Sequence, residues 1–199
     1  VIESLREPLE EGYITVSRAK GSYRFPASCT LIASMNPCPC GYYGSKHKRC
    51  TCSASDIERY ARKLSGPIMD RIDMWVPVLH IDYDTLSEKK DAEGSELIRK
   101  RIHDARLFAK NRFVAKGEQS ISKNKDMKSK DIGVHVTLDE PCRVLMKKLA
   151  TSYALSPRAY HRVLRLARTI ADYRSSVTIR ESDILEAFQY RPKLYDDRV

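Results

Sequence analysis

Four cysteines constrain this chain more than any other feature, because they form two tight pairs joined by a short loop. They are Cys38, Cys40, Cys50 and Cys52, with nine residues between the pairs. Four thiolates at about 2.3 Å from the metal are the ligand set of a tetrahedral structural zinc ion. Gly41 and Gly44 give the loop the backbone freedom to fold back. We therefore predict a four-cysteine zinc site, the alternative being four reduced surface thiols.

The remaining metal-binding residue types are weaker candidates. His47 lies inside the same loop and is an alternative ligand. Cys29 and Cys142 lie in apolar patterns, so we expect two ordinary buried thiols. A lysine-rich chain without a visible secretory signal favours reduced thiols and a metal over disulfides.

A polar amide directly precedes the cysteine loop. Ser28–Met35 reads as a short apolar strand, mostly buried, that ends at Asn36 and Pro37. Open α/β sheets place ligand-contacting groups at the carboxyl ends of their strands. We therefore expect a nucleotide-type site beside the metal loop.

Charge and hydropathy indicate the class of partner. The 199 residues carry a formal net charge of +10, which favours a polyanionic partner such as nucleic acid, nucleotide or an anionic membrane surface. A solvated basic surface is the alternative. No run of about 18 apolar residues is present, so we expect a cytoplasmic protein without a membrane span. The chain begins without Met in a helix-like pattern, which suggests a fragment of a longer protein.

The first half has mixed helix and strand patterns, and we expect a partial α/β core over residues 1–81. Its expected elements are a helix end at Val1–Leu9 stopped by Gly12, a β-hairpin over Tyr13–Phe25, the strand Ser28–Met35, a helix to Leu64 with a Ser55/Glu58 capping box, a short helix after Ser65-Gly66-Pro67, and a strand at Asp73–Leu79.

The second half reads as an all-α, four-helix lid over residues 95–193, after a linker at 82–94. Its expected helices are Ser95–Phe113, with an apolar face from Leu97 to Ala109, then one to Ser152 capped by Thr137, one over Ser156–Tyr173, and one to Tyr190 capped by Thr178. Lys116–Asp131 is so polar that we expect a mobile, disordered loop.

Two arginines are candidates for phosphate contacts. Arg71 lies between Asp70 and Asp73 just before an expected strand, where it could reach a phosphate on a neighbouring subunit. An intramolecular salt bridge is the alternative. Arg158 lies in the first turn of its helix, where the dipole and exposed N–H groups favour anions. Arg162 and Arg165 follow at helical spacing, and a solvated basic face is the alternative there.

The sequence has no G-x-x-x-x-G-K-[ST] loop and no apolar run that ends in paired acids. We therefore expect that this chain alone does not hydrolyse ATP.

Basic side chains gather at two turns, where they could follow a nucleic-acid backbone. They are Arg18, Lys20 and Arg24 at the hairpin and Lys46, Lys48 and Arg49 in the cysteine loop. The competing site, or a solvated face, is formed by Arg99, Lys100 and Arg101.

Several long motifs resemble the magnesium-chelatase-like AAA+ ATPases, specifically the ComM/YifB family, over nearly the whole chain. They are LREPLEEGYITVSRA, ASMNPCPCGYYG, RCTCSASDIERYARKLSGPIMDRID, SPRAYHRVLRLARTIADYR and EAFQYR. The resemblance implies that the Walker A and Walker B motifs lie upstream of Val1 and that this chain is the C-terminal part of an AAA+ core followed by its lid.

The resemblance also implies roles for individual residues. Asn36 matches sensor 1, Arg71 matches the arginine finger that acts on a neighbouring subunit's ATP, and Arg158 matches sensor 2. The hairpin Ile14–Phe25 matches the pre-sensor-1 hairpin. The full-length family member is implied to bind ATP and Mg²⁺ and to form a hexameric ring that drives DNA branch migration.

Two other functions remain as alternatives. One is a chelatase-type ATPase that remodels a protein partner. The other is a non-enzymatic zinc module that binds nucleic acid, and the combination of Asn36, Arg71 and Arg158 argues against it.

Overall fold

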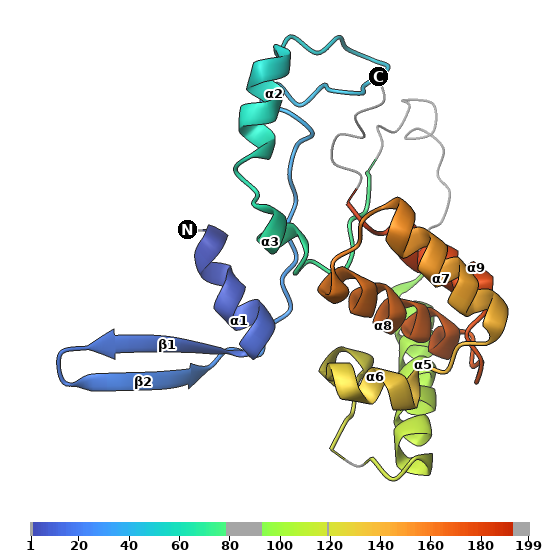
Figure 1. The fold of residues 1–199 in the computed structure, drawn as a ribbon. Coiled ribbons are helices and arrows are strands. Elements are labelled where there is room, and N and C mark those ends of the chain that lie inside the picture. The colour runs from blue at the N-terminus through green and yellow to red at the C-terminus, as the bar shows by residue number, and fades with distance from the viewer. Residues whose placement is uncertain (1, 79–92, 119, 193–199) are drawn as a thin grey trace. The chain divides into compact units, whose positions relative to one another are not determined.

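The computed structural model describes residues 2–78, 93–118 and 120–192. These residues form two compact units, one built mainly from residues 2–72 and the other from residues 73–77 and 93–191 (Figure 1). The expected linker at 82–94 and the end of the expected strand at Leu79 fall almost wholly outside the described residues. Within those residues, no helix combines the length and apolar character that crossing a bilayer requires.

The first unit begins with a helical segment and a hairpin. Its elements here are η1 (Ile2–Leu5), α1 (Arg6–Glu11), β1 (Tyr13–Arg18) and β2 (Gly21–Pro26). Gly12 ends α1 in the left-handed region, at φ +71°. The strands pair antiparallel with Arg18 opposite Gly21, so Ala19 and Lys20 form the turn. The predicted helix stop and hairpin are confirmed, and the ribbon projects beyond α1 (Figure 1).

Two short helices follow the cysteine loop, α2 (Ala54–Ala61) and α3 (Gly66–Met69). The predicted Ser55 cap is wrong. Ser53 Oγ accepts a hydrogen bond from the Asp56 N–H at 3.2 Å, and the Asp56 carboxylate accepts one from the Ser53 N–H. This box starts the helix earlier than expected. Ser65 caps α3, as the predicted break indicated.

Neither strand predicted outside the hairpin forms in the described residues. Residues 27–36 and 74–78 have no regular secondary structure, and Ile32 and Val78 are each 90 % exposed. A strand persists only when a neighbouring strand satisfies its backbone groups along its length, and the sheet in the described residues contains only β1 and β2. The Trp75 N–H does donate to the Tyr190 carbonyl at 2.8 Å, but one such bond does not make a strand. Cys29 is correspondingly exposed, so its predicted burial is wrong.

The second unit is helical, as predicted. Its elements are α5 (Ser95–Ala115), η2 (Asn124–Asp126), α6 (Ser129–His135), α7 (Glu140–Ser152), α8 (Pro157–Tyr173) and α9 (Glu181–Gln189). Helix α8 packs against α5, α6, α9 and η2, while α7 packs on α9 (Figure 1). The four predicted helices are confirmed, and α6 is additional.

Side-chain caps fix where these helices begin. Ser156 Oγ accepts from the Ala159 N–H at 3.1 Å, which confirms the predicted start of α8. The predicted caps Thr137 and Thr178 are wrong. Asp139 caps α7, and the Asp183 carboxylate accepts from the Arg180 N–H at the start of α9. An ionised carboxylate is a stronger acceptor than a threonine hydroxyl, so it sets the start of the helix.

One apolar cluster forms the core of this unit. It consists of Ala109, Phe113, Ile121, Met127, Ile132, Val136, Leu138, Cys142, Met146, Val163, Leu164, Ala167, Ala171, Ile179, Ile184 and Ala187. Helix α5 enters the core only through its C-terminal half. Leu97 is 60 % exposed, and Ile98 and Ile102 are exposed as well, so the N-terminal part of the expected apolar face of α5 is not covered by the described residues.

The polar segment 116–131 is structured over the residues described, which corrects the prediction of a disordered loop. It contains η2 and the start of α6, and Ile121 and Met127 are buried. Asn124 anchors it. Its Oδ1 accepts from Arg112 at 2.6 Å, and its Nδ2 donates to Asp172 at 2.7 Å. These contacts order the segment despite its polar composition.

Asp172 on α8 is the centre of this buried network. Its carboxylate accepts from Arg112 Nη2 at 3.1 Å and from Arg168 Nε at 3.0 Å. Arg168 also donates to the Val177 carbonyl at 2.7 Å. The side chains of Arg168 and Asp172 are 1 % and 2 % exposed. The carboxylate therefore compensates two cations that water hardly reaches.

We expect Asp172→Asn to lower the free energy of unfolding by about 3–5 kcal/mol, because it leaves two buried guanidinium groups without a countercharge. Urea unfolding of this chain measures the change. Asp104→Asn is the matched control, because Asp104 is exposed on α5. Equal stability of the two variants would contradict the role given to Asp172.

Candidate metal centre and phosphate-contact residues

The four paired cysteines converge on one point. Their Sγ atoms all lie within 4.8 Å of one another. The Sγ atom of Cys50 lies 3.7 Å from that of Cys38 and 3.5 Å from that of Cys40, and the Cys38 and Cys40 sulfurs are 3.3 Å apart. Tetrahedral zinc with sulfurs at about 2.3 Å has edges of about 3.8 Å. The predicted convergence is confirmed, and the donor set fits a metal ion of this kind.

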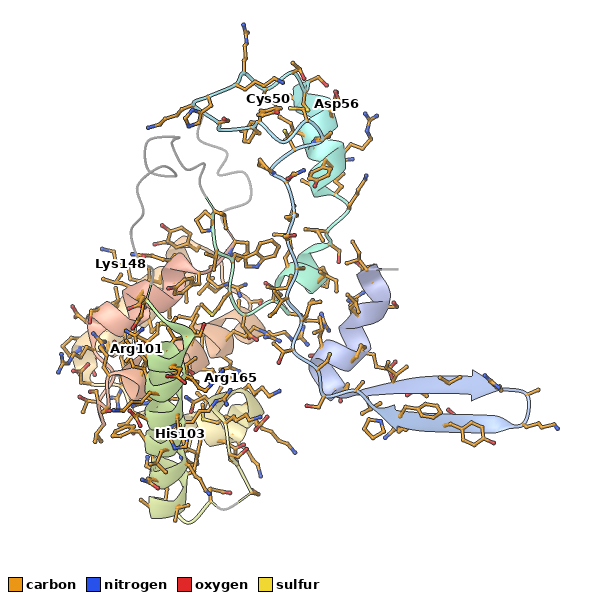
Figure 2. All side chains as sticks on the ribbon, turned by 180° about the vertical axis from the view of Figure 1, so that it is seen from behind. Cys50, Asp56, Arg101, His103, Lys148 and Arg165 are labelled. Carbon is orange, nitrogen blue, oxygen red and sulfur yellow. The ribbon has the colours of Figure 1, made fainter. Side chains whose placement is uncertain are left out.

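The local fold of the loop explains this convergence. Gly41 and Gly44 adopt positive φ angles of +85° and +75°, which bend the chain back on itself. The Gly41 N–H donates to the Cys38 carbonyl at 3.0 Å. Cys38 is buried. Figure 2 labels Cys50, in the loop before α2, and Asp56, in the first turn of that helix. The glycines therefore have the role that the sequence predicted.

Backbone N–H groups favour the thiolate form of Cys40, whereas burial disfavours the thiolate form of Cys52. Hydrogen bonds from the backbone of Thr51 and Tyr42 lower the pKa of Cys40 to about 5. Burial raises the pKa of Cys52 to about 12. Metals bind cysteine as thiolate, so binding here displaces protons and weakens as pH falls.

The other candidate ligands lie outside the cluster. The convergent donor set contains only cysteines, and His47 is exposed, with its backbone N–H donating to Ser45 Oγ at 3.2 Å. Cys142 is buried as predicted, and its Sγ donates to the Ile179 carbonyl at 3.5 Å. Burial raises the pKa of Cys142 to about 12, which makes this thiol unreactive.

Asn36 lies directly against the metal loop. A Cβ atom added to Gly41 would lie 3.8 Å from Asn36 Nδ2. Ser34, Met35, Asn36 and Tyr60 line a small surface pocket. The expected proximity of the amide and the metal loop is therefore observed, although Asn36 follows an irregular segment rather than a strand.

Arg71 is held inside the first unit. Its Nη1 donates to the Pro67 carbonyl at 2.8 Å, and its Nη2 pairs with the Glu10 carboxylate. The residue is 9 % exposed. Of the two possibilities that the sequence left open, this conformation has the intramolecular salt bridge. Glu10 lies 61 positions away, and no spacing rule connects such distant residues, so sequence reasoning missed it.

Arg158 belongs to the second unit and is exposed in the first turn of α8. The next two arginines, Arg162 and Arg165, are half-buried. Arg162 pairs with Asp73, and its side chain is 10 % exposed. Burial, with the nearby Arg162 charge, lowers the pKa of Arg165. Arg158 is thus the exposed member of the three arginines at helical spacing.

The expected nucleic-acid contacts all face solvent. Arg18, Lys20, Arg24, Lys46, Lys48 and Arg49 are exposed. Arg24 stacks 4.5 Å from the centre of the Tyr13 ring, and Lys48 Nζ lies 4.5 Å from the centre of the Tyr42 ring. In the competing set, Arg101 lies on α5 (Figure 2). It pairs with Glu93.

Comparison of the sequence with models of protein families identifies the class of protein. The model of magnesium chelatase, subunit ChlI, matches residues 1–86. The model of the ChlI C-terminal region matches residues 92–191. The chain belongs to the magnesium chelatase subunit ChlI family.

Relatives within this class include ComM and YifB proteins, as the sequence motifs indicated. Competence protein ComM of Haemophilus influenzae is 35 % identical over 96 % of this chain and 36 % of its own length. The YifB proteins of Escherichia coli and Salmonella typhimurium are each 32 % identical over the same shares. The chain therefore spans little more than a third of the length of these relatives.

We expect purified protein to contain about one zinc ion per chain, because four converging thiolates match a closed structural site. Cys50→Ser should lower the zinc content sharply, as measured by elemental analysis. Cys29→Ser is the matched control, since Cys29 is exposed and outside the cluster. Metal-free protein in which all four clustered thiols titrate freely would contradict the assignment.

Proposed function

We propose that this chain is the sensor, arginine-finger and lid portion of a ring-forming AAA+ ATPase that drives DNA branch migration or unwinding. The family match over nearly the whole chain carries this proposal. Since the chain covers about a third of its relatives, ATP and Mg²⁺ would be held largely by residues outside it. The assembly proposed is a cytoplasmic homo-hexamer.

Three side chains would act on the nucleotide. Phosphoryl transfer to water needs positioning and charge neutralisation more than covalent chemistry. Asn36 would orient the attacking water. Arg71 would neutralise charge on a neighbouring subunit's γ-phosphate, and Arg158 would contact phosphate from the lid.

Zinc would act structurally rather than chemically. Four protein ligands leave no open coordination position for a substrate. The Cys38 to Cys52 loop lies against Asn36 through Gly41, so a bound metal would fix the backbone beside the proposed sensor. Chelation should therefore disturb Asn36 before it disturbs the lid.

The exposed basic hairpin supports DNA as the substrate. Lys20 lies in the turn, and Arg18 and Arg24 flank it on the paired strands. Cations on a projecting ribbon can follow a phosphate backbone without reading base edges. Lys46, Lys48 and Arg49 would add contacts from the metal loop.

A second candidate function is ATP-driven remodelling of a protein partner. The match to models of magnesium chelatase subunits favours it. It shares the nucleotide chemistry and differs in what the hairpin touches. Binding of DNA by the hairpin separates the two functions.

We expect Arg71→Ala in the full-length protein to leave ATP binding nearly unchanged and to lower turnover by about 10³-fold, the scale typical of arginine fingers. Steady-state hydrolysis and nucleotide titration measure the two effects. Mixed rings of Arg71→Ala subunits and subunits with an inactivated phosphate loop should regain activity. If no mixing ratio restores turnover, Arg71 does not act in trans.

We expect Lys20→Ala with Arg24→Ala to weaken binding of unrelated DNA sequences alike, because phosphate contacts carry no sequence information. The slope of log affinity against log salt should flatten by about one to two units. Fluorescence anisotropy over a salt series measures both. Arg99→Ala with Lys100→Ala is the matched control on α5. Loss of affinity only in the control would move the contact to the lid, and no loss in either would favour a protein substrate.

A further inference from the structure

A largely enclosed ion pair in the first unit joins two segments that are far apart in the sequence. Glu10 lies at the end of α1, and Arg71 follows α3. Their side chains are 29 % and 8 % exposed. The contact therefore puts a carboxylate of the same chain against the arginine proposed to act on a neighbouring subunit.

In this arrangement the guanidinium of Arg71 has no open edge. Nη2 pairs with Glu10, Nη1 donates to the Pro67 carbonyl, and Nε is buried without a partner among the described residues. Arginine recognises phosphate through two parallel N–H bonds from one edge of the fork. The edge that carries Nε and Nη2 is closed by burial and by the Glu10 carboxylate.

The charges of the pair also make Arg71 unavailable to a phosphate. The Glu10 carboxylate offsets the positive charge of Arg71, so the pair offers a phosphate little net attraction. Separating an enclosed ion pair without replacement leaves an uncompensated charge, which is strongly unfavourable. Exchange of one anion for another avoids this, and a nucleotide phosphate offers the same fork-shaped pair of oxygens as a carboxylate.

We propose that Glu10 is an intramolecular competitor of nucleotide phosphate: it holds Arg71 in cis and gives it up when a neighbouring subunit's nucleotide takes its place. The proposal rests on the arginine-finger function proposed for Arg71. It makes hydrolysis depend on the close approach of a loaded neighbour, because an isolated subunit keeps its arginine occupied.

Chemical modification tests the cis contact without any activity. Phenylglyoxal is applied to this chain, and modified arginines are mapped by mass spectrometry. Arg71 should react several-fold more slowly than the exposed Arg18. Glu10→Gln should raise the Arg71 rate several-fold, and the matched control Glu11→Gln should leave it unchanged. Equal Arg71 rates in wild type and Glu10→Gln would overturn the proposal.

Turnover of the full-length protein tests the competition. Glu10→Gln should raise ATP hydrolysis per subunit several-fold at protein concentrations where rings form only in part, because Arg71 without its competitor would engage a neighbour's nucleotide more readily. The gain should vanish in Glu10→Gln with Arg71→Ala, which should match Arg71→Ala alone. Lower turnover in Glu10→Gln with intact rings would overturn competition, because Glu10 would then support the finger.

Two further measurements separate the causes of failure. Thermal melting shows whether Glu10→Gln is folded at the assay temperature; if it is not, Glu10→Asp replaces it, because a shorter carboxylate has less reach to Arg71. If Arg71→Ala alone does not change turnover, the arginine-finger function fails and the competition with it. The modification rates would then still report the cis ion pair.

Discussion

The convergence of four sulfur atoms is the constraint on which the first unit depends. The apolar cluster found in the described residues lies wholly in the second unit. In the first unit the buried apolar side chains are few, Cys38 and Ile68 among them. The four Cys Sγ atoms meet within 4.8 Å of one another and so close the segment from Cys38 to Cys52. A metal bound there would add its binding free energy to folding, because the unfolded chain has no preformed site.

The second unit is held in a different way. An apolar cluster supplies most of the burial, and Asp172 joins two arginines and Asn124 at its edge. Buried polar networks stabilise a single arrangement only when every member is satisfied. Here the network draws the polar segment after α5 onto α8. The network therefore ties that segment to α5 and α8 through buried, charge-assisted hydrogen bonds.

The sequence predicted features that depend on local interactions and missed features that depend on distant residues. Helices and the hairpin were predicted because spacing, caps and turn residues act locally, and the cysteine pairs because their loop is short. The strands around Ile32 and Val76 were wrong, since a strand depends on a partner that its own residues do not identify. The caps at Asp139 and Arg180 were missed by two residues, because neighbouring polar side chains compete for the same N–H groups. Glu10 carried no local signal at all.

The residues proposed to act on nucleotide are fixed by three different kinds of contact. Asn36 lies against a loop closed by sulfur, Arg158 stands on a helix capped by Ser156, and Arg71 is held by the Glu10 carboxylate. The Gly41 backbone beside Asn36 and the Ser156 hydroxyl at the start of the Arg158 helix are not anions, so a nucleotide phosphate does not compete with them. A carboxylate and a phosphate compete for the same guanidinium, so only the third contact can respond directly to a loaded neighbour. The position of Arg71 is therefore where this chain would sense its assembly.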